Sequence, residues 1–334
     1  MSSFFTPYKD FLDATLHLAE GSAKPLLLAS GKLEHLGLGF LRFSCLQPSK
    51  LKLVFSAGIH GNETGPIEVL NQLIADIASG HLIPETDCLF ILGNPEAMRI
   101  EDRFIDTNLN RLFKSGLQVD NKDLESRRAH LIMDVTRAFL KNAKSSIHYD
   151  LHTAIRSSFY EKFAVYPYLP ARTCSPEQLE LMGFSDIEAI LLQNNSASTF
   201  SAWTASEFGT ESFTIELGKV APFGQNNLSR MSAIAEVLRN LISHQRPTQK
   251  PNKLPIQFQV VDEIINQGEN FELCIDEDIA NFTELPTGFR VWRNAETEYL
   301  IGTTPLSIVF PNSKVGPGQR AGLLVKPMSG LVLA

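Results

Sequence analysis

The sequence predicts an α/β protein in which helices flank a layered sheet, followed by a small all-β domain. Short apolar runs alternate with longer segments of helical periodicity up to residue 243, as in layered α/β sheets. Residues 244–255 are polar and rich in proline, which is typical of a linker. Beyond them, short β-type runs are separated by Gly, Pro and Asn, without a convincing helical pattern. We therefore predict two domains, 1–245 and 255–334.

The first elements lead into a polar turn. Residues 8–20 predict a helix because their apolar side chains repeat at helical spacing. The apolar run LKLVFSA at 51–57 predicts a buried strand, which continues into a glycine-rich turn at 58–65. Pro66 suits the first turn of a helix over 66–78, since the N–H that proline lacks would have no partner there.

Strands and helices then alternate. The run CLFIL predicts a strand at 88–92, and Leu131, Val135 and Phe139 align on one face of a predicted helix at 124–141. The other strands predicted in this domain are 145–151, 163–166, 189–192 and 213–217, and its other helices are 199–208 and 227–243. The strands predicted in the C-terminal domain are 256–261, 289–292, 307–310 and 322–325.

Composition and charge narrow the class of protein. The chain has 334 residues, 43% of them hydrophobic and 20% charged, which excludes disorder, collagen and coiled coil as overall descriptions. Its formal net charge is -7, so it has no global positive field to hold nucleic acid. We expect a small-molecule partner rather than a nucleic acid.

Cysteine usage and the absence of long apolar segments suggest a compartment. The four cysteines are scattered without C-x-x-C spacing, which argues against a thiolate zinc cage and a disulfide framework. The N-terminus lacks the basic and apolar regions of a signal peptide, and no stretch of about 18 apolar residues occurs. We expect a soluble, cytoplasmic protein without membrane association, and the sequence leaves its oligomeric state open.

Two histidines and one glutamate predict a metal site. His60 and Glu63 stand three residues apart in the turn after the strand at 51–57, and His152 comes at the end of the strand at 145–151. Catalytic zinc takes three N or O ligands and leaves a fourth position for water. Strand ends suit this task because loops there reach a shared crevice while the sheet fixes their roots. We predict that His60, Glu63 and His152 bind one metal ion.

Other interpretations of these residues stay open at this point, because an H-x-x-E spacing alone is a weak signal. His60 is equally consistent with a loop histidine that bonds to backbone, and Glu63 with an acid that the helix dipole favours at a helix start. His148 competes with His152, but it lies inside the predicted strand and is expected in the core or beside a ligand.

Two neighbours are expected to support the site. Asp150 lies two residues before His152 and is expected to orient its imidazole. Gly61 is expected to take a positive φ, which would let His60 and Glu63 converge.

Five motifs in order make the chain resemble a known family. They are AGIHGNETGP (57–66), GNPEAMR (93–99), RFIDTNLNRLF (103–113), HYDLHTAIRSSFYEKFAVYP (148–167) and FTIELGKVAPFG (213–224). With them the chain closely resembles the succinylglutamate desuccinylases, in the aspartoacylase branch of the zinc carboxypeptidase-like hydrolases. The resemblance spans about residues 50 to 240, and the family is expected to carry a C-terminal β domain as well.

The resemblance implies a fold, a reaction and a set of residues. The fold would be a carboxypeptidase-like mixed sheet flanked by helices. The reaction would be zinc-dependent hydrolysis of N-succinylglutamate to succinate and glutamate, the last step of the succinyl route of arginine breakdown. The motifs place His60, Glu63 and His152 as ligands of one Zn²⁺ per chain, Glu216 as the catalytic carboxylate, and Arg103, Asn110 and Arg111 against the substrate. Asn108 departs from the pattern, since relatives commonly have an acid there, and this puts the support of Arg111 in question.

Each of these residue types suits its implied task. Glu216 would act as general base, taking the proton of the attacking water and delivering it to the departing nitrogen. Its alternative is an acid at a strand end that pairs with Lys219 or another cation. Arg103 would stabilise the oxyanion, because a permanently charged guanidinium acts on the developing negative oxygen. Its alternative is a surface arginine.

The three carboxylates of the implied substrate require several cations. Arg111 with Asn110 would bind one of them, and Arg156 is a further anchor for another. Weaker candidates are Tyr166, Lys162 and Lys219. The net charge does not oppose this, because distant surface acids are screened within about 8 Å at physiological salt.

Two other functions remain possible from the sequence. One is a related acyl-amino-acid hydrolase, such as an aspartoacylase-like deacetylase or a peptidase of the parent fold, which would share the zinc chemistry and differ in its acyl pocket. The other is a metal-binding assembly protein without catalysis, which would leave Glu216 and Arg103 without a task.

Overall fold

The computed structural model describes residues 8–17, 23–116, 118–120, 122–247, 249–268, 270–276 and 278–328. Its helices are α1 (Phe11–Leu16), α2 (Thr64–Ala78), α3 (Pro95–Arg99), α4 (Leu124–Leu140), α5 (Pro176–Phe184), α6 (Phe200–Phe208) and α7 (Ser232–Ile242), with 3-10 turns η1 (Leu109–Arg111) and η2 (Leu228–Met231). The strands before residue 250 are β1 (Leu26–Leu28), β2 (Gly31–Gly37), β3 (Phe40–Cys45), β4 (Leu51–Ala57), β5 (Asp87–Leu92), β6 (Ser145–Ala154), β7 (Lys162–Tyr166), β8 (Ala189–Leu192) and β9 (Glu211–Lys219). Those after it are β10 (Ile256–Ile265), β11 (Glu272–Leu273), β12 (Thr283–Leu285), β13 (Arg290–Arg293), β14 (Glu298–Leu300), β15 (Leu306–Val309) and β16 (Arg320–Pro327).

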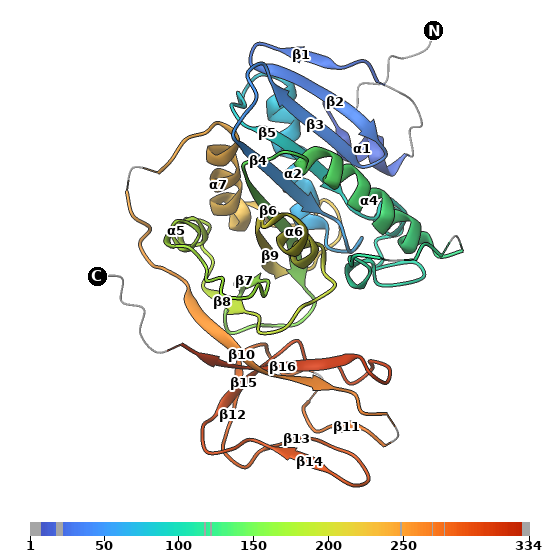
Figure 1. Cartoon of the computed structure of the whole chain (residues 1–334), viewed down its shortest axis with the longest axis vertical. Coiled ribbons are helices and arrows are strands. Elements are labelled where there is room, and N and C mark those ends of the chain that lie inside the picture. The colour runs from blue at the N-terminus through green and yellow to red at the C-terminus, as the bar shows by residue number, and fades with distance from the viewer. Residues whose placement is uncertain are drawn as a thin grey trace.

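One mixed sheet runs through most of the molecule (Figure 1). Its 13 strands follow the order β1-β2-β3-β5-β4-β6-β9-β7-β8-β10-β16-β15-β12, and β11, β13 and β14 form a second, antiparallel sheet. At its centre, β5, β4, β6 and β9 are parallel neighbours. The carboxyl ends of these strands therefore meet at one edge, which is where α/β sheets bind ligands.

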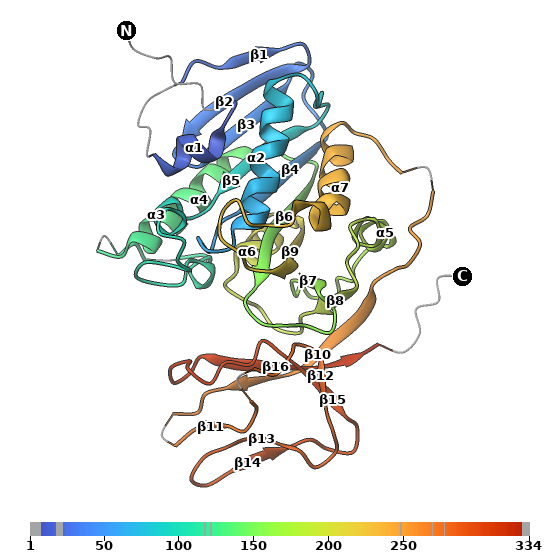
Figure 2. The same ribbon diagram turned by 180° about the vertical axis from the view of Figure 1, so that it is seen from behind.

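Helices cover both faces of the central sheet. Strand side chains alternate between the faces, so Leu53 and Phe55 of β4 pack towards α2, whereas Val54 packs towards α4 and α6. Figure 1 shows α4 and α6 on the near face, and Figure 2 shows α1, α2 and α7 on the opposite face. This double cover explains why the central strands are nearly continuous apolar runs.

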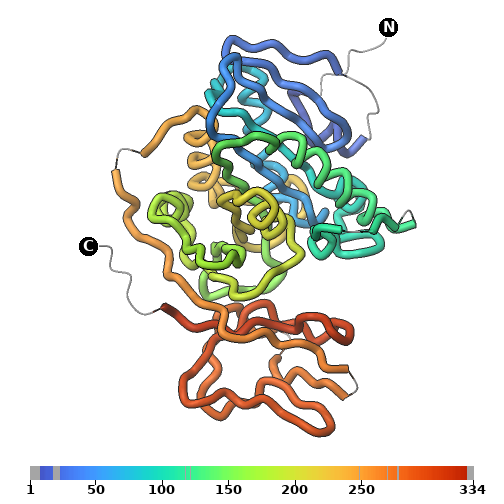
Figure 3. Tube along the Cα trace, in the orientation of Figure 1, coloured from blue at the N-terminus to red at the C-terminus, as the bar shows by residue number. Residues whose placement is uncertain are grey.

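The C-terminal strands extend the sheet of the larger domain. Figure 3 shows the chain passing from α7 through a long connection into β10, which pairs in parallel with β8. An aromatic cluster seals this junction, with Phe163 of β7 packing against Phe282 at a ring distance of 5.2 Å. A separate apolar core lies between the two sheets of the C-terminal part. The predicted α/β sheet with a small all-β C-terminal domain is confirmed, and the continuity of the sheet is an additional finding.

Most predicted elements are present, with shifted ends. The strands at 51–57 and 189–192 have the predicted bounds, whereas the helix predicted at 66–78 begins at Thr64 and that at 227–243 is divided into η2 and α7. The first helix is shorter than predicted, and its predicted residues 18–20 lie outside the described part of the chain. Strand β6 continues to Ala154, so His152 lies within the strand.

Several elements were not predicted. They are β1, β2 and β3 at the sheet edge, the short helices α3 and α5, and β11, β12 and β14. Within the described residues, no helix combines the length and the apolar character needed to cross a membrane.

Candidate metal centre and active site

His60, Glu63 and His152 meet at the carboxyl edge of the central strands. Glu63 lies between the two imidazoles, with Oε1 2.8 Å from Nδ1 of His60 and Oε2 2.8 Å from Nδ1 of His152. One ligand atom from each of the three residues lies within 4.8 Å of the other two. All three side chains are buried, at 4% exposed or less. Residues 92 positions apart in the sequence thus form one compact donor group.

The start of α2 sets the position of Glu63. Glu63 is the N-cap residue of α2, but its side chain makes no capping hydrogen bond. Its carboxylate instead turns back to the histidines and also accepts the backbone N–H of Thr153 at 3.1 Å. The interpretation of Glu63 as a simple helix-start acid is therefore wrong.

Gly61 contributes close packing rather than an unusual backbone angle. The prediction of a positive φ at Gly61 is wrong, because the positive φ in this turn is found at Gly58, at 68°. A Cβ on Gly61 would lie 2.2 Å from the backbone carbon of Ala97 and 2.3 Å from the backbone nitrogen of Met98. The turn thus packs directly on α3, and no larger residue fits there without moving backbone.

Each of the two imidazole rings has a hydrogen-bond partner on its Nε2 atom. Asp150 Oδ2 lies 2.9 Å from Nε2 of His152, as predicted, and Asn108 Oδ1 lies 3.1 Å from Nε2 of His60. The backbone N–H of Asn110 donates to the same Asn108 oxygen at 3.0 Å, which fixes that atom as an acceptor. Acceptors on both Nε2 atoms favour the tautomer in which each Nδ1 lone pair is free for a ligand.

The Asn108 side chain contacts His60, a contact that was not predicted. Among the described residues Arg111 has no carboxylate in salt-bridge distance, in line with the doubt that the asparagine at position 108 raised about its support. Arg111 bonds to the carbonyl of Asn110 at 2.9 Å instead. No spacing rule links residues 60 and 108, so sequence reasoning had no signal for this contact.

His148 belongs to the network behind the donor group. Its Nε2 lies 2.9 Å from Ser56 Oγ, and its Nδ1 lies 2.7 Å from Thr204 Oγ1. Ser56 in turn donates to Asp150 Oδ1 at 2.6 Å. His148 thus has both ring nitrogens engaged away from Glu63, which agrees with the prediction that it is a core or supporting residue.

The donor group fits a catalytic zinc ion. Two imidazole nitrogens and one carboxylate are the ligand types of such sites, and three protein ligands leave a position open. The observation that tests the fit is the pair of Nδ1 atoms, both turned to the same carboxylate while both Nε2 atoms are occupied by other partners. Asp150 and Asn108 supply the outer hydrogen bonds that orient metal-binding histidines.

Burial and mutual charge set the protonation of this group. Burial opposes ionisation of Glu63, but the charges of His60 and His152 hold its pKa well below the usual range. Burial lowers the pKa of His60 to about 4. Burial also acts to lower the pKa of His152, but Asp150 and Glu63 raise it above its ordinary value. The Glu63 carboxylate therefore remains charged at neutral pH.

Glu216 lies directly beside His152. The two residues are register partners in the parallel strands β6 and β9, so their side chains leave the same side of the sheet. Glu216 is 8% exposed, and its Oε2 has no hydrogen-bond partner in the structure. Burial and the negative charge of Glu63 raise the pKa of Glu216 to about 7. A carboxyl group with a pKa near neutral is suited to accept and return a proton.

Three predicted substrate residues come from the segment between α3 and α4. Arg103 donates through Nη1 to Glu63 Oε1 at 2.8 Å, which places its guanidinium at the donor group. Asn110 accepts the backbone N–H of Phe200 through Oδ1 at 2.9 Å, so its Nδ2 is the group left for a ligand. Burial, together with the charges of Arg320 and Arg103, lowers the pKa of Arg111 to about 10.

A buried acid in α4 shapes this segment. Glu125 is fully buried and accepts the backbone N–H groups of Ile105, Asp106 and Thr107 at 2.7 to 3.2 Å. It also accepts Nδ2 of Asn94 at 2.9 Å. These bonds replace regular secondary structure between residues 103 and 108, and they fix the path on which Arg103 and Asn108 lie.

The weaker anchors differ in their surroundings. Tyr166 is excluded, because its hydroxyl donates to Glu211 Oε2 at 3.0 Å, at the opposite end of β9 from Glu216. Arg156 lies two residues beyond the end of β6, and Lys219 is the exposed last residue of β9. Both are therefore at the same sheet edge as His152.

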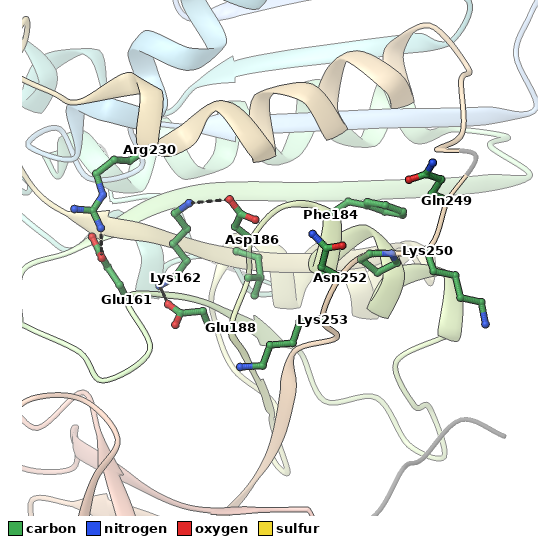
Figure 4. Close-up of a pocket in the computed structure, with 13 residues that line it drawn as sticks. Glu161, Lys162, Phe184, Asp186, Glu188, Arg230, Gln249, Lys250, Asn252 and Lys253 are labelled. Carbon is green, nitrogen blue, oxygen red and sulfur yellow. Dashed lines mark hydrogen bonds and ion pairs between the residues drawn. The ribbon is translucent and has the colours of Figure 1, made fainter.

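Lys162 lines a different pocket. Figure 4 shows a pocket, which we call the linker pocket, with Lys162 directed towards Asp186 and Arg230 towards Glu161. Its volume is about 580 Å³, and its walls come from 161–162, 183–184, 186–188, Arg230 and 249–253. Lys162 Nζ lies 3.7 Å from Asp186, and Arg230 is paired with Glu161. None of the metal-site residues lines this pocket, so its size does not make it the active site.

Comparisons with known proteins agree with the geometry. Residues 49–242 match the succinylglutamate desuccinylase/aspartoacylase catalytic domain, and residues 255–328 match the AstE/AspA barrel-sandwich hybrid domain. The chain is 40% identical to a succinylglutamate desuccinylase of Pseudomonas paraeruginosa over 323 residues, which cover 95% of this chain and 97% of that protein.

Solved structures of similar proteins share the whole fold. A succinylglutamate desuccinylase from Vibrio parahaemolyticus superposes with a TM-score of 0.89 at 34% identity, covering 97% of this chain and 96% of that one. One from Chromobacterium violaceum has a TM-score of 0.84 at 35% identity, covering 97% and 99%.

Proposed function

Because the chain belongs to the succinylglutamate desuccinylase/aspartoacylase family, we propose that it hydrolyses N-succinylglutamate to succinate and glutamate. The observation that carries the proposal is the buried His60–Glu63–His152 group with Glu216 beside it. The identity to proteins named for this activity supports the choice of substrate. The reaction would close the succinyl route of arginine breakdown.

We propose one Zn²⁺ per chain, held by His60, Glu63 and His152. When bound, zinc supplies Lewis-acid polarisation of the carbonyl and lowers the pKa of water to about 7. The donor set and the outer hydrogen bonds from Asp150 and Asn108 support this assignment.

Glu216 moves the proton in the proposed reaction. Its carboxylate accepts a proton from the attacking water and then protonates the amide nitrogen, which leaves as the amine of glutamate. Its position beside His152 and its pKa of about 7 suit both transfers. The unpartnered Oε2 is the atom assigned to carry this proton.

Cations of the site hold the negative charges of the substrate. Arg103, already at the donor group, stabilises the oxygen that becomes negative when water adds. Arg111 and the Nδ2 donor of Asn110 bind a carboxylate of the glutamate moiety, and Arg156 binds a further carboxylate.

A panel of substrates tests this function and its rivals. N-succinylglutamate, N-acetylaspartate and N-acylated peptides should be assayed in parallel for amine release, with metal content measured before and after chelation. We expect N-succinylglutamate to be hydrolysed fastest and activity to follow the zinc content. If N-succinylglutamate is the poorest of the three substrates, the specificity is wrong although the fold stands.

Replacement of Glu216 by Gln separates catalysis from simple metal binding. The E216Q variant should keep its zinc and lose activity about 100- to 10,000-fold, the range of general-base effects. A metal-binding assembly protein would bind zinc without turnover in either form. Loss of zinc together with activity would make Glu216 a ligand rather than the base.

We further propose a catalytic domain at 1–245 and a C-terminal β domain at 255–334. The matches at 49–242 and 255–328 support this division. The cytoplasm is the proposed compartment, supported by the free state of all four cysteines. The proposed partner is the small-molecule substrate alone.

A further inference from the structure

A bulge in β9 places Lys219 on the same side of the sheet as Glu216. His152 pairs with Glu216, and Ala154 pairs with Lys219, so β9 advances three residues while β6 advances two. Because strand side chains alternate between faces, Lys219 would face the opposite side without this extra residue. Gly218 lies in this bulge, and its φ of 109° is unfavourable for residues other than glycine.

Lys219 and Arg156 line one small pocket next to the metal-site residues. This β6–β9 pocket has a volume of about 160 Å³ and is lined by Ala154, Arg156, Ser157, Ser158, Glu161, Gly218 and Lys219. Ala154 lies about 7 Å beyond His152, given a strand rise of about 3.3 Å per residue. The pocket therefore lies at the same edge of the sheet as His152, two residues further along β6.

The β6–β9 pocket carries positive charge without a matching acid. Its carboxylate, Glu161, is already paired with Arg230. Among the described residues, neither Arg156 nor Lys219 has an acidic partner within salt-bridge distance, in contrast to Lys162 and Arg230 of the linker pocket. Two unpaired cations at one small pocket favour an anionic ligand group.

The C-terminal part of the chain fixes the loop that carries Arg156. The backbone N–H of Asn281 donates to the carbonyl of Ser157 at 2.9 Å, and the N–H of Phe159 donates to the carbonyl of Asn281 at 3.1 Å. Ser158 donates from its hydroxyl to the carbonyl of Tyr160 at 2.5 Å. A loop fixed in this way loses little conformational entropy when a ligand binds.

We propose that the β6–β9 pocket binds the terminal carboxylate of the succinyl group, with Lys219 and Arg156 as its cationic contacts. This inference rests on the proposed function and adds the acyl end of the substrate to it. The terminal carboxyl carbon lies three C–C bonds from the scissile carbonyl carbon, about 4 Å when extended. A succinyl group reacting beside His152 and Glu216 thus reaches towards the pocket, where the long side chains of Lys219 and Arg156 complete the distance.

Succinate and butyrate differ by one carboxylate and test the pocket directly. Their binding to the zinc-loaded protein should be measured by titration calorimetry for the wild type, Lys219→Met, Lys219→Arg, Arg156→Met and Lys162→Met. Lys219→Met and Arg156→Met should each weaken succinate binding about 10- to 100-fold, as for loss of a charged hydrogen bond, and change butyrate binding less than about 3-fold. Lys219→Arg should retain most of the preference for succinate.

Lys162→Met is the matched control, because it removes a lysine from the linker pocket that is paired with Asp186. It should bind both ligands as the wild type does. In kinetics, Lys219→Met should lower kcat/KM for N-succinylglutamate by the same factor as succinate binding, and leave N-butyrylglutamate hydrolysis nearly unchanged.

The outcomes separate this inference from the proposed function. If Lys219→Met and Arg156→Met leave succinate binding unchanged, or weaken succinate and butyrate equally, the pocket assignment is wrong. The same holds if the wild type does not prefer succinate over butyrate. If succinate binds in a Lys219-dependent way but N-succinylglutamate is not hydrolysed, the pocket stands and the proposed function falls.

Discussion

The metal-free protein should become more stable when Glu216 is replaced by Gln, and the gain should grow with pH. Burial and the charge of Glu63 raise the pKa of Glu216 from 4.5 to about 7. The folded chain therefore binds this proton more tightly than the unfolded chain does. The raised pKa of Glu216 contributes its full share of the unfolding free energy below pH 4.5, and this contribution is lost as the pH rises through about 7. Glutamine stays neutral and carries no such pH dependence.

The structure sets the size of this effect. The difference between a pKa of 4.5 and one of about 7 corresponds to about 3 kcal/mol of unfolding free energy at high pH. Linkage arithmetic gives about 1.4 kcal/mol at pH 5.5, so the advantage of E216Q should grow by about 2 kcal/mol between pH 5.5 and pH 8.5. Urea unfolding of the chelated proteins at both pH values measures it.

Glu236 of α7 offers the matched control. Its side chain is exposed on the helix surface, so Glu236→Gln should give the same stability difference from wild type at both pH values. Parallel pH dependence for E216Q and wild type would refute the reasoning, because it would mean that the Glu216 carboxyl ionises as easily in the fold as in the unfolded chain. The test needs no turnover, so it stands apart from the catalytic role.

Three further changes have defined outcomes. Gly61→Ala should lower the free energy of unfolding in urea by about 1 to 3 kcal/mol, because its Cβ would overlap the backbone of Ala97. Gly302→Ala, which has open space around its Cβ, should change stability by less than about 0.5 kcal/mol. Equal effects of the two changes would contradict the packing argument. Asn108→Leu should weaken zinc binding about 10- to 100-fold in metal titrations, whereas Asn108→Asp, which keeps an acceptor for His60, should not. Unchanged zinc affinity in Asn108→Leu would show that the contact with Asn108 does not support His60 as a ligand. Chelation should stop amine release and lower Tm, and Zn²⁺ should restore both, because a ligand bound only by the folded state stabilises it; full activity after verified metal removal would rule out the zinc mechanism.

The central strands could be predicted from the sequence because each is marked by an apolar run of neighbouring residues. The run at 51–57 is apolar at its buried positions except Ser56 and leads into a glycine-rich turn, so strand and turn follow from neighbouring residues alone. The strands β2 and β3, close to the edge strand β1, instead mix buried residues with partly exposed ones, and the charged side chains of Glu34 and Arg42 pair across them. Such strands lack an apolar run, and their pairing becomes visible only in three dimensions.

The candidate site divides in the same way. His60, Glu63 and His152 follow from strand ends and residue chemistry, and the contact of Asp150 with His152 follows from a spacing of two. The contact of Asn108 with His60 does not, because it depends on how Glu125 folds the intervening loop. The position of Lys219 depends on a β-bulge, which cannot be predicted from composition or from the periodicity of apolar residues.

The chain carries a net charge of -7, yet several arginines gather near the proposed active site. Burial lowers the pKa of Arg111, and the nearby charges of Arg320 and Arg103 lower it further. Arg320 opens β16, so a strand of the C-terminal part adds to the field at a residue of the larger domain. Arg103 is paired with Glu63, but within the described residues neither Arg111 nor Arg320 has a carboxylate in salt-bridge distance, so no ion pair offsets the repulsion between these two. An anion with several carboxylates would relieve it, whereas surface acids more than about 8 Å away are screened. We therefore expect Arg111 and Arg320 to favour a substrate with several carboxylates, although the net charge of the chain is negative.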